Sequence, residues 1–256
     1  MRAGYTKALT NTVIKKLSNQ YSVELVSIKD EQFETCKGCA CLFAGSSRCP
    51  LSGDSVHGVL QKMLDADGVI FFVPNYSLQI PGKLKTMLDR MAFVFHRPRL
   101  FNKVFMPITV QGVYGGGDIS KYLNKVLRFW GARTVKGAVL SGGIYPKQAD
   151  AKLYTKKNMN NLDKSLMDFN HEMEAFKPKK PSLFQVAIYR STRSSMLYFD
   201  EALAPDKEYY LKNGWDKADY YYDVHLGIFK KTVGLIIDKQ MKAMAKKANK
   251  TQETLN

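Results

Sequence analysis

Hydrophobic positions in the first half of the chain switch repeatedly between helical spacing and short apolar runs. Leu9, Val13 and Leu17 recur at helical spacing, which predicts a helix within residues 5–21, and the run 23–28 predicts a strand. The same patterns predict further helices over 56–65, 84–91 and 119–130 and further strands over 68–74, 104–110 and 135–140. Alternating strands and helices predict right-handed βαβ crossovers, and therefore an α/β fold with a doubly wound parallel sheet.

The run from Gly68 to Pro74 is the clearest strand signal in the sequence. It is continuous, β-branched and aromatic, with no polar residue between the apolar ones. This pattern is typical of a strand that is buried on both faces of a parallel sheet.

The alternation stops after Pro146. Residues 149–176 have the pattern of a long polar helix, Lys177 to Pro181 has the pattern of a connector, and the remainder predicts helices rich in aromatic residues. The sequence therefore predicts an α/β domain over 1–148, a linking helix over 149–178 and a helical, aromatic-rich, basic C-terminal extension over 179–256.

Composition and charge restrict the class of partner. Hydrophobic residues make up 45% of the 256 residues and charged residues 24%, which excludes collagen, a coiled coil and general disorder. Lysine and arginine total 39 against 23 acidic residues, a net charge of +16. Because both halves of the chain are basic, we expect an anionic partner such as a phosphorylated cofactor, nucleic acid or acidic lipid.

The chain shows neither the apolar core of a signal peptide in its first twenty residues nor an apolar run of ~18 residues that could span a membrane. These patterns predict a soluble, cytoplasmic protein. All four cysteines fall between Cys36 and Cys49, whereas a disulfide framework would spread them along the chain. Their clustering indicates a reduced compartment and a local role.

Two loops offer chemistry at the predicted carboxyl edge of the sheet, where open α/β folds bind ligands. Residues 74–79 form a proline-led turn with an aromatic ring and amide groups, and residues 111–117 form a glycine-rich loop that opens a helix. Bare backbone in such a loop can approach a flat ring or an anion. The start of the first helix should share the same crevice.

The order of these motifs resembles the flavodoxin-like NAD(P)H-dependent FMN reductases, and especially the branch that includes the iron-sulfur flavoproteins. The resemblance covers roughly residues 2–145. It rests on Arg2-Ala3-Gly4-Tyr5-Thr6, Cys36-Lys37-Gly38-Cys39, Asp65-Ala66-Asp67-Gly68, Pro74-Asn75-Tyr76, Lys85 with Asp89-Arg90, and the glycine loop 112–117. A looser similarity, at Arg128 to Gly131, Trp215 and Tyr220 to Asp223, is to members with a helical C-terminal extension.

The resemblance implies an FMN-dependent oxidoreductase in which NADH or NADPH delivers hydride to the flavin and a second acceptor takes the electrons. The acceptor would be a quinone, free flavin, a small electrophile or a redox protein, and the protein a homo-oligomer. No catalytic acid or base is implied, because the flavin carries the chemistry. The implied FMN-binding residues are Arg2, Gly4, Tyr5 and Thr6 at the phosphate, Pro74, Asn75, Tyr76, Ser77 and Leu78 along the ribityl chain and one ring edge, and Gln111, Gly112, Val113, Tyr114 and Gly115 at the other edge.

The cysteines Cys36, Cys39, Cys41 and Cys49 could ligate a [4Fe-4S] cluster or zinc. The iron-sulfur flavoproteins place two residues between the second and third cysteines, and this chain has only Ala40. A bound cluster, a zinc or redox role, and a loop without metal therefore stay open.

The chain departs from the family at its beginning, because Met1-Arg2 already lies inside the loop that follows the family's first strand. That strand is central in the order 2-1-3-4-5. We expect either a start site assigned too late or a truncated gene; if Met1 is the true start, direct pairing of the remaining strands is expected and flavin affinity is in doubt.

Two other classes of function remain as alternatives. One is a flavodoxin-like binding module without flavin, and the other is a protein that binds a polyanion or a membrane surface through its basic C-terminal region. The aromatic residues between 184 and 229 favour packing over stacking on nucleic-acid bases, and the basic helix 230–250 favours a solvated face over attachment to acidic lipid.

Overall fold

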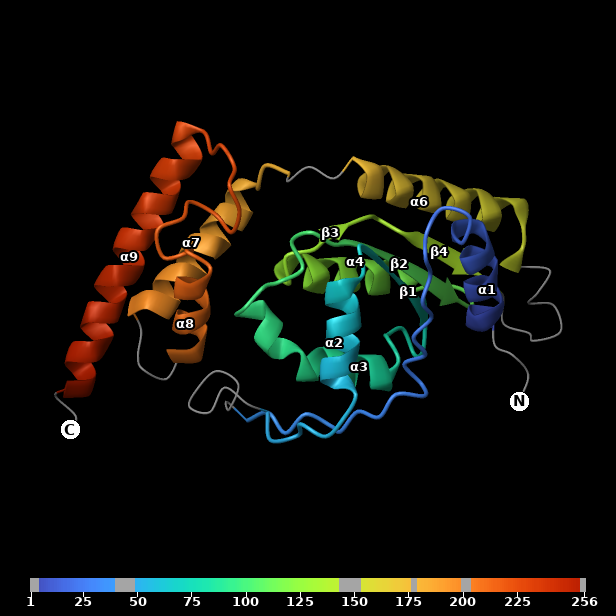
Figure 1. Cartoon of the computed structure of the whole chain (residues 1–256), viewed down its shortest axis with the longest axis horizontal. Helices are drawn as coiled ribbons and strands as arrows, with labels where there is room; N and C mark the ends of the chain where they lie inside the picture. Colours follow the sequence, from blue (N-terminus) through green and yellow to red (C-terminus); the bar gives the residue numbers. More distant parts are fainter. Residues whose placement is uncertain (1–4, 40–48, 143–152, 176–178, 199–203, 254–256) are drawn as a thin grey trace. The chain divides into compact units, whose positions relative to one another are not determined.

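The computed structural model describes residues 5–39, 49–142, 153–175, 179–198 and 204–253. The chain divides into two compact units (Figure 1). The first comprises Met1–Cys36 and Gly53–Phe176, and the second comprises Lys37–Ser52 and Lys177–Asn256.

The first unit is a parallel sheet with helices on both faces (Figure 1). Its strands are β1 (Gly68–Pro74), β2 (Val104–Gln111), β3 (Arg133–Thr134) and β4 (Ala138–Ser141). Its helices are α1 (Tyr5–Leu17), α2 (Val56–Asp65), α3 (Gly82–Arg90), the 3₁₀ turn η1 (Ala92–Phe95), α4 (Gly116–Phe129) and α6 (Lys156–Glu174). This confirms the predicted α/β class.

Strand β2 is the centre of the sheet. It pairs in parallel with β1 on one side and with β3 and β4 on the other. Its residues Val104, Met106, Ile108 and Val110 join α1 and α6 in one hydrophobic core. Because side chains alternate along a strand, Phe105 and Thr109 point to the opposite face, which α4 covers.

Only the end of the predicted strand 135–140 is formed, as β4 from Ala138, and β3 lies just before the predicted range; the backbone at Gly137 separates the two. This residue has φ +76°, and a Cβ built there would lie 1.8 Å from the carbonyl oxygen of Pro107. Such a close approach to β2 is open only to glycine. The chain therefore pairs with β2 as two short segments, β3 and β4.

Strand β1 occupies residues 68–74 as predicted, but the expectation that it is buried on both faces is wrong. Only Val73 is fully buried, while its neighbours from Gly68 to Phe72 are half-buried. Within the described ranges β2 is the only strand that pairs with β1, so β1 is an edge strand. The strand with the fully buried pattern is β2.

The predicted strand over residues 23–28 is not formed, so it pairs with none of the described strands, whereas those strands pair directly with one another. Residues 22–27 run as irregular backbone, and Val23 and Leu25 are exposed, so the segment has no buried face. Its Glu24 instead forms an ion pair with Lys62 of α2. A strand needs a hydrogen-bonded neighbour, which the local apolar pattern could not reveal.

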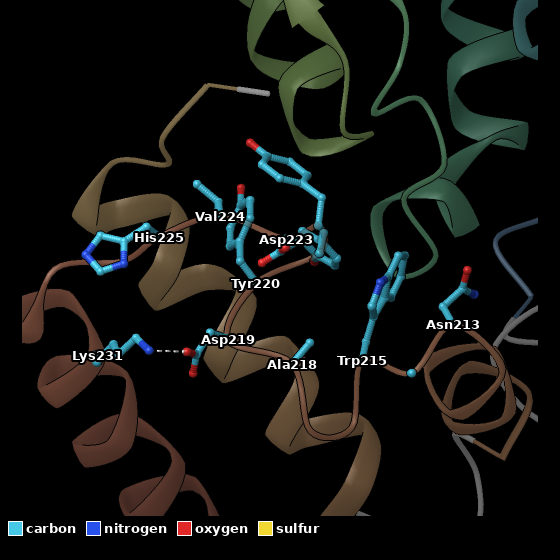
Figure 2. Close-up of a pocket in the computed structure, with 12 residues that line it drawn as sticks. Asn213, Trp215, Ala218, Asp219, Tyr220, Asp223, Val224, His225 and Lys231 are labelled. Carbon is cyan, nitrogen blue, oxygen red and sulfur yellow. Dashed lines mark ion pairs between the residues drawn. The ribbon is translucent and has the colours of Figure 1, made fainter. Parts of the chain in front are cut away.

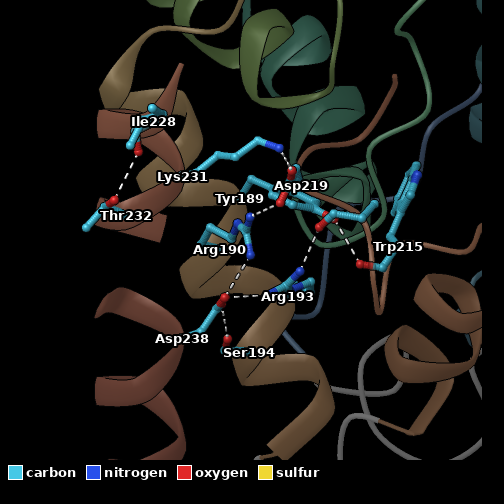
Figure 3. Close-up of polar contacts among 11 residues, drawn as sticks. Tyr189, Arg190, Arg193, Ser194, Trp215, Asp219, Ile228, Lys231, Thr232 and Asp238 are labelled. Atoms are coloured by element: carbon cyan, nitrogen blue, oxygen red, sulfur yellow. Dashed lines mark hydrogen bonds and ion pairs between the residues drawn. The ribbon is translucent and has the colours of Figure 1, made fainter. Parts of the chain in front are cut away.

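The second unit contains α7 (Leu183–Tyr198), α8 (Ala204–Lys212) and α9 (Ile228–Glu253). A buried polar network joins α7 to α9: Asp238 accepts hydrogen bonds from Arg190, Arg193 and Ser194 (Figure 3). In the part of the chain that the structure describes, no helix is long and apolar enough to cross a membrane.

Candidate functional site at the carboxyl edge of the sheet

The loops that follow β1 and β2 lie side by side because the two strands end in register. Pro74 of β1 is the partner of Val110 of β2, and the next backbone N–H, that of Asn75, donates to the Val110 carbonyl at 2.8 Å. The side-chain amide nitrogen of Asn75 then donates to the carbonyl of Tyr114 at 2.7 Å. One side chain thus ties the two loops together.

Gln111 holds the glycine-rich loop from inside. Its amide nitrogen donates to the Val113 carbonyl and to the Ser141 hydroxyl, each at 3.0 Å. Its amide oxygen accepts from the N–H of Gly116 at 2.7 Å, at the first turn of α4. All three polar functions of this side chain fix the loop at the ends of β2 and β4.

Both loops contain backbone in the left-handed region. Ser77 and Leu78 have φ of +51° and +66°, and Gly115 has φ +95°. A Cβ built on Gly115 would lie 2.8 Å from Cδ2 of Leu78 and 3.1 Å from Nδ2 of Asn75. Non-glycine residues with positive φ are strained, and such strain is concentrated at ligand sites.

The mouth of this loop pair exposes flat and apolar side chains. Tyr76 is 62% exposed and Tyr114 is 67% exposed, and Leu78 and Val113 are exposed beside them in sequence. Two aromatic rings and two aliphatic side chains from neighbouring loops form a surface that suits a planar ring system.

Asn75 also presents an unused acceptor. Its Oδ1 is buried and has no hydrogen-bond partner among the described residues, although the nitrogen of the same amide is bonded to Tyr114. A buried carbonyl oxygen without a donor is costly, so the site favours a ligand with an N–H or O–H group at that position.

The predicted phosphate site begins at α1. Tyr5 starts the helix and Thr6 follows it, while Arg2 and Gly4 lie outside the described residues. The Thr6 carbonyl accepts from the hydroxyl of Thr10, one turn later. The free N–H groups and the dipole of a helix N-terminus favour an anion such as a phosphate.

These residues fit the chemistry of FMN. The loop surface suits a planar isoalloxazine, the Asn75 acceptor suits an N–H or hydroxyl group, and the start of α1 suits a phosphate. The predicted residues that the structure places in the two tied loops are Pro74, Asn75, Tyr76, Ser77, Leu78, Gln111, Gly112, Val113, Tyr114 and Gly115.

The cysteine positions do not assemble a metal centre in the described ranges, where no group of three or more His, Cys, Asp or Glu side chains is placed to hold a metal ion. Cys36 and Cys39 are exposed, and Cys49 is half-buried. Cys41 lies outside the described residues. Because the described donors do not converge, we derive no step of the reaction through a cluster.

A buried ion pair that the sequence did not reveal, together with a hydrogen bond, involves residues on either side of the cysteine-containing stretch 36–49. Arg90 of α3 donates to the carboxylate of Asp54 and, at 3.0 Å, to the carbonyl of Glu34. Burial raises the pKa of Asp54, but hydrogen bonds from the Glu34 and Val56 N–H groups and from Arg90 outweigh it and lower that pKa below its usual value. Arg90 thereby binds both Glu34 and Asp54 to helix α3.

The neighbouring charged residues of α3 have a simpler role. Lys85 and Asp89 form an ion pair one turn apart on the helix surface. Their partner in the motif, Arg90, instead points inward and is buried. Arg90 is buried because it pairs with Asp54, which lies far from it in sequence. Helical spacing alone could therefore not distinguish the buried Arg90 from the exposed Lys85 and Asp89.

The second unit contains a shallow cavity of about 650 Å³ (Figure 2). It is lined by Asn213, Gly214, Trp215, Ala218, Asp219, Tyr220, Tyr221, Tyr222, Asp223, Val224, His225 and Lys231. The aromatic rings contact one another edge to face; the ring centroids of Trp215 and Tyr221, for example, are 4.8 Å apart. The Nζ of Lys231 forms an ion pair with the carboxylate of Asp219 at 3.0 Å. Burial raises the tyrosine pKa values, as at Tyr220, so these hydroxyls stay protonated.

That arrangement agrees with packing for the aromatic residues around the cavity, whereas Phe184 and Phe229 at the ends of the stretch 184–229 are exposed. Tyr189, Tyr210, Trp215 and Tyr220 are buried, so their faces are not free to stack on bases. Tyr189 also donates to the carbonyl of Trp215 at 2.9 Å. The candidate site is therefore the pair of loops in the first unit.

A parallel sheet with helices on both faces and two loops tied together at its carboxyl edge has the architecture of a flavodoxin-like fold. The solved structure of RosB with a bound 8-demethyl-8-formylriboflavin-5'-phosphate intermediate has a similar fold, with a TM-score of 0.53 at 12% identity over 89% of this chain and 86% of RosB. The model of the NADPH-dependent FMN reductase family matches residues 1–146. The chain belongs to this family, whose members are NAD(P)H-dependent flavin oxidoreductases.

Two curated relatives extend the comparison. An iron-sulfur flavoprotein of Archaeoglobus fulgidus is 26% identical over 215 residues, which cover 83% of this chain and 94% of that protein. A quinone reductase of Escherichia coli K12 is 26% identical over 96 residues, covering 38% of this chain and 51% of that protein. Both similarities agree with the family assignment.

Proposed function

We propose that this protein binds FMN between the loops after β1 and β2, takes hydride from NADH or NADPH onto the flavin, and passes the electrons to a second acceptor. The observation that carries the proposal is the tied loop pair, in which exposed Tyr76 and Tyr114 flank the unpartnered acceptor Oδ1 of Asn75. Bound FMN would supply the two-electron chemistry.

The protein's own contribution is to bind and orient. Asn75 and Gln111 fix the two loops by hydrogen bonds that are already formed, so little ordering is needed when a ligand binds. The start of α1, with Arg2, Gly4, Tyr5 and Thr6 in sequence, would hold the phosphate. Tyr76 or Tyr114 would lie against the ring.

No side chain of the loop pair needs to move a proton. The polar groups that face it are amides, hydroxyls and backbone groups, and hydride transfer to a flavin requires orientation more than acid-base catalysis. The exposed rings of Tyr76 and Tyr114 leave the site open to solvent. The nicotinamide and the acceptor can therefore use it in turn.

A quinone is the acceptor class that the relatives favour, since one of them is named a quinone reductase. Free flavin, a small electrophile or a redox protein are the other acceptors that the same open site would admit. A homo-oligomer also stays a prediction, which sedimentation velocity would test.

The test is an anaerobic absorption experiment on the protein saturated with FMN. Addition of NADH or NADPH should bleach the flavin band near ~450 nm, and a soluble quinone should restore it. A flavin that binds but is not bleached by either nicotinamide would contradict the oxidoreductase proposal. No binding of FMN would favour the alternative of a binding module without flavin.

A further inference from the structure

Helix α9 has one face that packs against α7 and another that faces away from it. Asp238 lies on the packed face, where it pairs with Arg190 and Arg193. Gly234 is on the same face, since a Cβ there would lie 2.9 Å from Nε of Arg190. Figure 3 shows Ile228 and Thr232 on the side of α9 away from this network.

The outward face is apolar over the first turns of the helix. Ile228 is 86% exposed, Phe229 71%, Leu235 62% and Ile236 51%. Four large apolar side chains within nine residues, all at least half exposed, are unusual on a helix that is solvated on that side. The exposed fractions therefore favour a partner over the solvated face that the sequence pattern suggested.

One stripe that begins on this face, from Ile228 to Lys246, becomes basic further along the helix. Steps of four and three residues lead from Ile228 through Thr232 and Leu235 to Lys239, Lys242 and Lys246, which places all six on one side of α9. Lys242 lies at the edge of this side, where its Nζ is 5.1 Å from the ring centroid of Tyr198 in α7. From Ile228 to Ala248 the helix contains six lysines and one acidic residue, Asp238. Because Asp238 is turned toward α7, no acidic side chain opposes the lysines on this stripe.

We propose that this stripe binds the surface of an anionic lipid bilayer. Leu235 on the stripe and Ile236 beside it would enter the headgroup layer, and Lys239 and Lys246, with Lys242 at the edge of the stripe, would lie on lipid phosphates. An amphipathic helix of this kind lies on a membrane and does not cross it. The basic side chains of the C-terminal region would then bind anionic lipid headgroups.

A second copy of the chain suits the stripe less well. If two α9 helices paired in parallel along their full length, the lysines of one would face the lysines of the other. If they paired antiparallel, Leu235 and Ile236 of each copy would face the lysines of its partner. An anionic bilayer, by contrast, complements both halves of the stripe at once.

The test is cosedimentation of the full-length protein with phosphatidylcholine vesicles that contain or lack phosphatidylserine, at roughly 0.15 M salt. The wild-type protein should bind the anionic vesicles at least ~10-fold more tightly than the neutral ones. The triple variant Lys239→Gln/Lys242→Gln/Lys246→Gln should bind the anionic vesicles about 100-fold more weakly, and Leu235→Gln/Ile236→Gln at least ~10-fold more weakly.

The matched control replaces three exposed lysines of α6, as Lys156→Gln/Lys157→Gln/Lys164→Gln, which removes the same charge elsewhere. Its binding should stay within about twofold of the wild type. Equal losses in both triple variants would overturn the proposal, because net charge alone would then explain the binding. It would also be overturned if the wild type did not prefer anionic vesicles, or if Leu235→Gln/Ile236→Gln turned a dimer into a monomer without changing vesicle binding.

Discussion

The two units use the same residue types in opposite ways. In the first unit Tyr76 and Tyr114 stand exposed on loops whose backbone is already fixed by Asn75 and Gln111. In the second unit Tyr189 and Tyr210 are completely buried. An exposed aromatic ring on a rigid loop is available to a ligand, whereas a buried ring stabilises packing.

The polar groups show the same contrast. In the second unit the Asp238 carboxylate is shared by Arg190, Arg193 and Ser194, so each of its oxygens has a partner. In the first unit the Oδ1 of Asn75 is buried without one among the described residues. A carboxylate whose two oxygens both have partners fixes structure, whereas the buried amide oxygen of Asn75 leaves an acceptor for a ligand.

Breaking the ion pairs of Asp238 should have the largest effect. Asp238→Ala leaves Arg190 and Arg193 buried without this carboxylate, which should lower the free energy of unfolding by about 3–5 kcal/mol. Thermal and denaturant unfolding followed by circular dichroism measures it. A loss below about 1 kcal/mol would show that the network is not a fixed part of the second unit.

The buried pair of the first unit should respond to acid. The pKa of Asp54 is lowered in the folded protein, so its stabilisation is complete above the usual value of 3.8 and is lost as the pH falls through the folded pKa. As the pH is lowered below about 4, the free energy of unfolding should therefore fall less steeply in Asp54→Asn than in the wild type. Parallel curves for the two proteins would contradict the lowered pKa.

At the loop pair, Gly115→Ala should cost about 1–2 kcal/mol, because an alanine must adopt φ +95° there. Its Cβ would also press on Leu78 and Asn75, so FMN binding should weaken about 10-fold or more. Gly117→Ala is the matched control, since nothing lies within 4 Å of its added Cβ. If the two substitutions changed FMN affinity equally, the backbone at Gly115 would not be part of the flavin site.

The smallest effect is expected at an exposed ion pair. Lys121→Gln removes the pair with Asp118, and both side chains are largely exposed. The free energy of unfolding should change by no more than about 0.5 kcal/mol in denaturant unfolding. A larger loss would mean that exposed charges stabilise the first unit as buried ones do.

The sequence predicted most elements of the first unit because their signals are local. Helical spacing at Leu9, Val13 and Leu17 predicted α1, and the apolar run at Gly68 to Pro74 predicted β1. The failures concern neighbours distant in sequence. Residues 23–28 have an apolar pattern but no strand partner, and the predicted strand 135–140 begins only after Gly137, whose backbone lies against Pro107.

The candidate site was predictable to a similar extent. The loops at 74–78 and 111–115 were indicated by their position after strands, and the structure brings them together through Asn75. The roles of their side chains toward FMN stay predictions. The Arg90–Asp54 pair was not predicted, since a charged residue on a helix pattern gives no sign of a buried partner 36 residues away.

The most direct test of the central claim is a titration of FMN into the wild-type protein, Asn75→Ala and Asn102→Ala, followed by flavin fluorescence. Asn102 is an exposed residue before β2, at the opposite end of the strand, and its substitution is the matched control. We predict that Asn75→Ala weakens FMN binding about 10-fold or more while Asn102→Ala matches the wild type. Equal affinity of all three proteins would contradict the claim that the loop pair binds the flavin.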